Sequence, residues 1–106
     1  MVMSDEIRTI QDKIVSAVPV EKLYLFGSYA DGTPHEHSDY DFYVVIPDGG
    51  LRPVEAVQGI FRAFRGMKRR PMDILAGTVE TFERRSKQIT LERTIANEGV
   101  LLYEKH

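Results

Sequence analysis

Two aspartates that lie two residues apart, Asp39 and Asp41, are the first candidates for chemistry in this sequence. They stand where a strand rich in β-branched and aromatic residues is predicted to begin, at Asp41 to Ile46. Because side chains alternate along an extended backbone, both carboxylates point to one side, about 7 Å apart at the backbone. Mg²⁺ takes carboxylate and phosphate oxygens as ligands, so a triphosphate could complete its shell. The pair predicts a metal site, with two solvated loop acids as the alternative.

The turn Gly27-Ser28 is the second candidate. It follows Leu23 to Phe26, a segment apolar at both parities, which is typical of a central strand covered on both faces. Ser28 to Asp31 fits a capping box that opens a short helix. Free N–H groups at a helix start, beside a glycine that lets a ligand approach the backbone, bind phosphate oxygens, and the Ser28 hydroxyl adds a donor. The alternative is an ordinary turn before a capped helix.

The third candidate is Asp73, inside the apolar segment Pro71 to Ala76 that predicts a further strand. An ionised carboxylate there is costly unless it is paired or bound to a cation. If this strand neighbours that of Asp41, at about 4.8 Å spacing, three carboxylates converge on a volume able to hold two metal ions. The alternative is a salt bridge from Asp73 to Arg69 or Arg70 at a strand end.

Helical patterns surround these strands. Ser4 caps a predicted helix from Asp5 to Ala17, and Pro53 opens another that Gly66 closes. The second helix carries Ile60 beside an apolar stripe, and the members of that stripe are Val54, Val57, Phe61 and Phe64.

The last third of the chain predicts two shorter helices and an apolar end. Thr78 caps a helix that runs to about Arg85, and a last helix spans about Gln88 to Asn97. Gly99 ends that helix, and Val100 to Tyr103 forms a terminal apolar segment.

Bulk composition limits the classes of function. We expect 106 residues to form one domain, residues 1–106. A net charge of -2 and a pI near 5.9 argue against a nucleic-acid binder, and the absence of cysteine excludes disulfides and cysteine-ligated metals. Neither a secretory signal in Met1 to Arg8 nor a membrane-spanning apolar stretch is seen, so a cytoplasmic location without a membrane partner is expected.

Other polar and aromatic residues near the motifs have less specific interpretations. His35 and His37 suggest a transition-metal site, but a flexible polar loop is favoured. The cationic run Lys68 to Arg70 could meet a triphosphate or an acidic partner, although a solvated helix end is favoured. Tyr29 and Tyr40 could contact a nucleobase or a partner, or could pack in the core.

The combined motif resembles a known family signature. Gly27-Ser28, ten residues, Asp39-Tyr40-Asp41 and a later strand aspartate, Asp73, are similar to the pattern of the polymerase-beta-type nucleotidyltransferase superfamily. The chain most resembles the minimal nucleotidyltransferases, the MNT proteins, over nearly its whole length. No motif position departs from the pattern.

The resemblance implies a nucleotidyltransferase fold of the α+β class, a two-layer α/β arrangement with a mixed sheet flanked by helices. It implies two Mg²⁺ ions bound by Asp39 and Asp41, with Asp73 sharing one ion, and transfer of AMP from ATP to a hydroxyl. Asp73 would assist deprotonation of that hydroxyl, while Gly27 and Ser28 bind the nucleotide. The second, mostly helical domain that helps build the acceptor site in larger antibiotic-modifying relatives cannot fit here.

For partners, the resemblance implies a toxin-antitoxin pair in which an MNT antitoxin neutralises a HEPN-domain ribonuclease, in some cases by AMP transfer to its tyrosine. A tyrosine hydroxyl becomes a reasonable acceptor once a metal ion or carboxylate helps remove its proton. Two alternatives stay open: nucleotidyl transfer to a small molecule in a pocket completed by another subunit, and a non-catalytic module that blocks its partner by binding. The sequence leaves the oligomeric state, a homo-oligomer included, open.

Overall fold

One mixed sheet organises the chain in a computed structural model that describes residues 4–27, 39–67 and 71–105. Its strands lie in the order β3-β2-β1-β4. They are β1 (Lys22–Phe26), β2 (Tyr40–Ile46), β3 (Met72–Thr78) and β4 (Val100–Glu104). β2 runs parallel to β3, whereas β1 is antiparallel to both β2 and β4. The central place predicted for the first strand is confirmed, because the terminal apolar segment pairs with it as β4.

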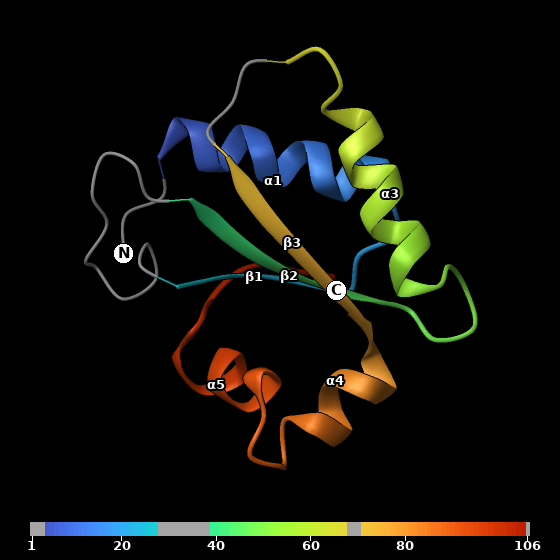
Figure 1. The fold of residues 1–106 in the computed structure, drawn as a ribbon, viewed down its shortest axis with the longest axis vertical. Coiled ribbons are helices and arrows are strands. Elements are labelled where there is room, and N and C mark those ends of the chain that lie inside the picture. The colour runs from blue at the N-terminus through green and yellow to red at the C-terminus, as the bar shows by residue number, and fades with distance from the viewer. Residues whose placement is uncertain (1–3, 28–38, 68–70, 106) are drawn as a thin grey trace.

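Helices cover both faces of this sheet. They are α1 (Asp5–Ala17), α3 (Pro53–Ala63), α4 (Val79–Arg85) and α5 (Leu91–Glu98). Figure 1 shows α1 and α3 above the sheet and α4 and α5 below it. The expected α+β fold, a mixed sheet flanked by helices, is confirmed. No helix in the described part of the chain is long and apolar enough to cross a membrane.

Residues of β2 alternate between two apolar clusters, one on each face. Phe42, Val44 and Ile46 pack with the isoleucines of α1 and with α3. Tyr43 and Val45 belong to a second cluster, which also contains Tyr24, Phe82 and Ile95 from β1, α4 and α5. Because side chains of a strand alternate, Asp41 lies on the face of this second cluster, here called the α4/α5 face.

α1 forms as predicted. The Ser4 hydroxyl accepts a hydrogen bond from the backbone N–H of Ile7 at 3.1 Å, and Ile7, Ile10 and Ile14 are buried. Acidic side chains in the first turn are favourable at the positive end of the helix dipole. The helix ends where Val18 is extended, as expected for the residue before a proline.

The interpretation of α3 is partly wrong. Val54 is 53% exposed and Phe61 is 37% exposed, although both were predicted on the buried stripe. The helix is turned so that Ala56, Ile60 and Phe64, spaced by four residues, face the sheet. A small alanine adds little to an apolar pattern but fits where a helix packs closely on a sheet, so the pattern pointed to the neighbouring face. The helix also ends earlier, with Phe64 rather than Gly66 next to its last turn.

Side-chain caps set the starts of the two short helices. Thr78 accepts a hydrogen bond from the N–H of Thr81 at 3.2 Å, as predicted for α4. Thr90 accepts from the N–H of Arg93 at 3.2 Å, so α5 begins at Leu91 rather than Gln88. Threonine oxygens satisfy N–H groups that a helix start leaves unpaired.

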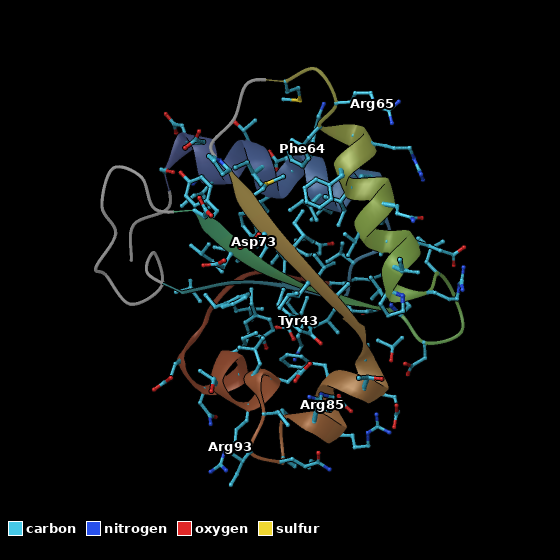
Figure 2. The ribbon with its side chains drawn as sticks, viewed as in Figure 1. Tyr43, Phe64, Arg65, Asp73, Arg85 and Arg93 are labelled. Carbon is cyan, nitrogen blue, oxygen red and sulfur yellow. The ribbon has the colours of Figure 1, made fainter. Side chains whose placement is uncertain are left out.

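A buried carboxylate, that of Glu92, ties α5 to the sheet. Glu92 is 9% exposed; it accepts a hydrogen bond from the Tyr43 hydroxyl at 3.1 Å and one from Arg85 Nε at 2.9 Å. Figure 2 shows Tyr43 and Arg85 on the same side of the sheet. The three side chains therefore join β2, α4 and α5.

The same contacts alter the ionisation of the network. Burial acts to raise the pKa of Glu92, but hydrogen bonds from Arg85, its own backbone and Tyr43 outweigh burial and hold that pKa below its usual range. Burial and the negative charge of Glu92 raise the pKa of Tyr43. Glu92 is therefore ionised and Tyr43 neutral near pH 7, the states that allow the hydroxyl to donate to the carboxylate.

We predict that Glu92→Gln lowers the free energy of unfolding by about 1 to 3 kcal/mol at pH 7, because it weakens a buried charged hydrogen-bond network. A lowered pKa stabilises the folded state above the ordinary glutamate pKa of 4.5, and this stabilisation is lost as pH falls below it. The difference between wild type and Glu92→Gln should therefore be full at pH 7 and shrink below pH 4.5. Urea unfolding at several pH values measures it.

Glu80→Gln is the matched control. Glu80 pairs with Arg84 at 3.6 Å, but both side chains are exposed, so its loss should cost less than about 1 kcal/mol. A Glu92→Gln protein as stable as wild type at pH 7, or a difference that is constant down to pH 3, would contradict the assigned role.

Candidate functional site

Three strand ends meet at one end of the sheet, on the α4/α5 face. Phe26, the last residue of β1, is the register partner of Asp41 on β2, and Asp41 is the register partner of Asp73 on β3. Register partners share a face of the sheet, so Asp41 and Asp73 are adjacent side chains. The two strands are thus neighbours, which is the condition on which the expected convergence of the carboxylates depended.

The carboxylate of Asp41 lies against Gly27, the residue directly after β1. Its φ is +74°, and a Cβ built on it would lie 2.2 Å from Asp41 Oδ2. A side chain at this position would be both strained and in collision with the carboxylate. The sequence suggested a glycine that admits phosphate; in the structure, the group that approaches its backbone is the carboxylate of Asp41. Ser28, predicted to bind with it, lies outside the described residues.

The carboxyl group of Asp41 is influenced by both other predicted carboxylates. Partial burial raises its pKa, and so do the negative charge of Asp73, a side-chain hydrogen bond with Asp73, and the charge of Asp39. Asp39 itself is exposed at the start of β2. Like charges that raise a pKa in this way favour a bound proton or cation. Asp39 and Asp73, the other two aspartates selected from the sequence, therefore both act electrostatically on Asp41.

Asp73 differs from its prediction in burial. The apolar segment around it suggested a buried carboxylate, yet its side chain is exposed, while Met72 and Ile74 are buried. β3 is an edge strand of the sheet, so its outward-facing side chains have a neighbouring strand on one side only. In Figure 2, Asp73 lies on the part of β3 away from α4. The alternative partners Arg69 and Arg70 lie outside the described residues.

Tyr40, between the two motif aspartates, is a packing residue. Its ring is buried in the cluster under α1, 6.0 Å from that of Phe42, and its hydroxyl donates to the carboxylate of Glu6. Alternation places it on the face opposite Asp39 and Asp41. It therefore fixes the start of β2 from behind. Tyr29, the histidines of the motif loop and the run Lys68 to Arg70 lie outside the described residues.

Two residues beside the carboxylates were not singled out from the sequence. Phe26 is the register partner of Asp41, and Leu75 follows Asp73 by two residues on the same face. The signal that would have found them is the two-residue alternation of strands, applied from each aspartate to its neighbours. A third omission, Glu92, is three residues before the buried Ile95 and therefore shares its helix face.

The donor set suits a hard cation. The carboxylates of Asp41 and Asp73 lie on neighbouring strands as register partners, and carboxylate oxygens are the ligands that Mg²⁺ takes together with phosphate. Within residues 4–27, 39–67 and 71–105, no three acidic, histidine or cysteine side chains form a group that could hold a metal ion by themselves.

Solved structures share this fold. One is a crystal structure of a toxin-antitoxin with AMP-PNP, with a TM-score of 0.62 and 22% identity over 97% of this chain and 76% of that one. Another is a putative nucleotidyltransferase from Sulfolobus solfataricus, with a TM-score of 0.63 and 20% identity over 92% and 77%. A mutant of the toxin-antitoxin MntA-HpeT has a TM-score of 0.60 and 22% identity over 93% and 73%.

The sequence comparisons address the family. No curated protein matches the chain. A family model described as polymerase beta, nucleotidyltransferase matches residues 8–106. That span contains all four strands, helices α3, α4 and α5, most of α1, all three aspartates and Gly27. The resemblance seen in the motif is confirmed, and the protein belongs to the polymerase-beta nucleotidyltransferase family.

Proposed function

We propose that the protein transfers a nucleoside monophosphate, AMP from ATP, to a hydroxyl acceptor. The observation that carries the proposal is the row formed by Gly27, Asp41 and Asp73 at one end of the sheet. It combines a close-approach glycine turn with adjacent carboxylates, and membership in the family gives the row its chemistry. Phosphoryl transfer of this kind depends on positioning and charge stabilisation more than on covalent chemistry by the protein.

Asp39, Asp41 and Asp73 would hold Mg²⁺, two ions in the family pattern. The metal would polarise the α-phosphate and offset the negative charge of the leaving pyrophosphate. The raised pKa of Asp41 supports this role, because a site where carboxylates crowd one another gains from a cation.

Gly27 and Ser28 would bind phosphate oxygens at the end of β1. Asp73 would accept the proton of the acceptor hydroxyl, since its exposed carboxylate on the edge strand is open to an incoming group. The acceptor oxygen forms a bond to the α-phosphorus, the bond to the pyrophosphate oxygen breaks, and the proton passes to Asp73. Atoms and charge balance without a further reactant.

The acceptor we propose is a tyrosine of a HEPN toxin, with this chain as its antitoxin. The support is the MNT-like motif together with two structures of the same fold that are described as toxin-antitoxin, one of them with AMP-PNP. Exposed Asp73 suits an acceptor carried on another protein, since a large partner can reach an edge strand more easily than a deep pocket.

We predict that Asp41→Asn lowers the rate of labelled AMP transfer by at least about a hundredfold, because it removes a charge at the centre of the row. The assay combines labelled ATP, Mg²⁺ and the purified partner, with mass measurement of every product. Asp48→Asn is the matched control: it removes the same charge at the far end of β2, where Asp48 accepts a hydrogen bond from the N–H of Glu80.

Transfer by Asp41→Asn at the wild-type rate would overturn the proposed site. Neutralisation of the partner without any labelled product, in wild type and in Asp41→Asn alike, would instead show a binding module. Label on a small molecule but not on the partner would identify a small-molecule acceptor.

We predict that Gly27→Ala reduces transfer at least about tenfold, because its methyl group must displace the carboxylate of Asp41. Gly49→Ala separates this effect from backbone strain, since Gly49 has a φ of +79° but nothing within 4 Å of a built Cβ. Backbone strain should cost both variants about 1 kcal/mol of stability in urea unfolding, the collision with Asp41 should add to that cost in Gly27→Ala, and only Gly27→Ala should lose transfer. Equal transfer by the two variants would contradict the role assigned to Gly27.

A further inference from the structure

The order of the strands separates the two ends of the proposed site. Gly27 follows β1, Asp41 lies on β2 and Asp73 lies on β3, so the three residues form a row across the sheet. The glycine turn, where phosphate oxygens would bind, is at the β1 end of this row. Asp73 is at the opposite end, on the edge strand. An acceptor that meets Asp73 therefore arrives over β3.

Leu75 is the next side chain on β3 that faces the same way. It lies two residues beyond Asp73 and is 39% exposed, although leucine is usually buried. Its register partner on β2, Tyr43, is buried and packs against Phe82, with ring centroids 5.2 Å apart. Next to Asp73, the exposed surface of β3 is therefore formed by the apolar side chain of Leu75. Towards β2 this surface is bounded by the packed cluster that contains Tyr43.

From this placement, and resting on the proposed function, we infer that Leu75 is a specificity-determining residue that contacts the apolar body of the acceptor while its hydroxyl meets Asp73. The acceptor class that fits is a phenol, such as a tyrosine side chain. The contact with Leu75 selects against hydroxyl groups that are attached to a short or polar side chain.

The spacing along the strand supports this class of acceptor. Residues two apart on a strand stand about 7 Å from each other, a separation that a whole tyrosine side chain, from its Cβ to its hydroxyl oxygen, can nearly span. A ring lying along β3 would cover Leu75 and bring its oxygen to the carboxylate. A serine hydroxyl is one bond from its Cβ, so its carrier leaves Leu75 uncovered. Burying part of a leucine and of a ring favours the first arrangement.

Leu101 provides a matched control within the same sheet. It is 43% exposed and is the register partner of Tyr24, which belongs to the cluster on the α4/α5 face. Leu101 lies on β4, the opposite edge strand from β3. Its exposure, residue type and face are like those of Leu75, but it has no carboxylate row beside it.

The experiment follows the leucine methyl signals of the full chain, with AMP-PNP and Mg²⁺ present, as N-acetyltyrosinamide is added. The Leu75 signals are identified by their absence in Leu75→Gln. We expect them to shift with saturation while the Leu101 signals stay in place, and N-acetylserinamide to move neither. The apparent Kd for N-acetyltyrosinamide, read from the Asp73 amide signal, should weaken at least about fivefold in Leu75→Gln and stay unchanged in Leu75→Met and Leu101→Gln.

Kinetics give a second measurement where a tyrosine peptide accepts AMP. Because the contact with Leu75 is made before and during transfer alike, Leu75→Gln should raise the KM for that peptide about tenfold and leave kcat nearly unchanged. A fall in kcat alone would instead indicate a disturbed carboxylate row and would overturn the inference.

Equal binding to wild type and Leu75→Gln, equal binding of the serine and tyrosine compounds, or no binding of N-acetyltyrosinamide would each overturn the inference. So would a shift of the Leu75 signals on addition of AMP-PNP alone that is larger than the shift caused by the acceptor compound. If any of these results is found while labelled AMP is still transferred to an acceptor, the inference about Leu75 fails and the proposed nucleotidyl transfer stands. Binding at Leu75 with no transfer to any acceptor would refute the proposed function and the acceptor role of Leu75 with it, and would leave only a binding site for phenols.

Discussion

The contact between the carboxylate of Asp41 and the backbone of Gly27 sets the geometry of the whole site. Antiparallel pairing places the end of β1 beside the start of β2, and the glycine leaves room for a carboxylate that any side chain would displace. Parallel pairing of β2 with β3 then brings Asp73 next to Asp41. The route from β2 to β3 passes through α3, because parallel neighbours need a crossover rather than a tight turn. The fold therefore assembles residues from distant parts of the chain into one row.

The alternation of β2 lets one strand serve both the core and the site. Tyr40 and Phe42 pack under α1, while Asp41 and Tyr43 face α4 and α5. On that second face, Glu92 on α5 is hydrogen-bonded to Tyr43 and Arg85. Tyr43 lies two residues after Asp41 on β2, on the same face of the strand. Neighbours fixed on both sides of β2 restrict the freedom of the strand that carries the aspartates. Such preorganisation is what charge stabilisation of a transferring phosphate requires.

Local sequence signals were enough to predict most elements. The cap at Ser4, the doubly apolar β1 and the cap at Thr78 each act within a few residues, and the structure has the elements they predict. The sequence was less informative about which face of a helix is buried, because tertiary packing decides that. In α3, Ile60 is buried and Val54 is exposed. From the sequence, the adjacency of Asp73 and Asp41 was only a condition. The exposure of Asp73 depends on β3 being an edge strand, which is a property of the sheet as a whole. The burial of Glu92 likewise depends on partners from α4 and β2.

The electrostatic repulsion among the crowded carboxylates must be offset by interactions elsewhere in the fold. Asp41 is partly buried beside two other acids, an arrangement that raises its pKa and stabilises nothing in the protein on its own. Sites of this kind persist when the surrounding structure holds them in place. Here the buried apolar side chains of β2, the Tyr40 contact with Glu6 and the Glu92 network supply that support. Under the proposed function, a bound cation would offset this repulsion and would in turn attract the anionic triphosphate. In the same proposal, the exposed side chains of Asp73 and Leu75 on the edge strand would leave one side of the row open to the acceptor.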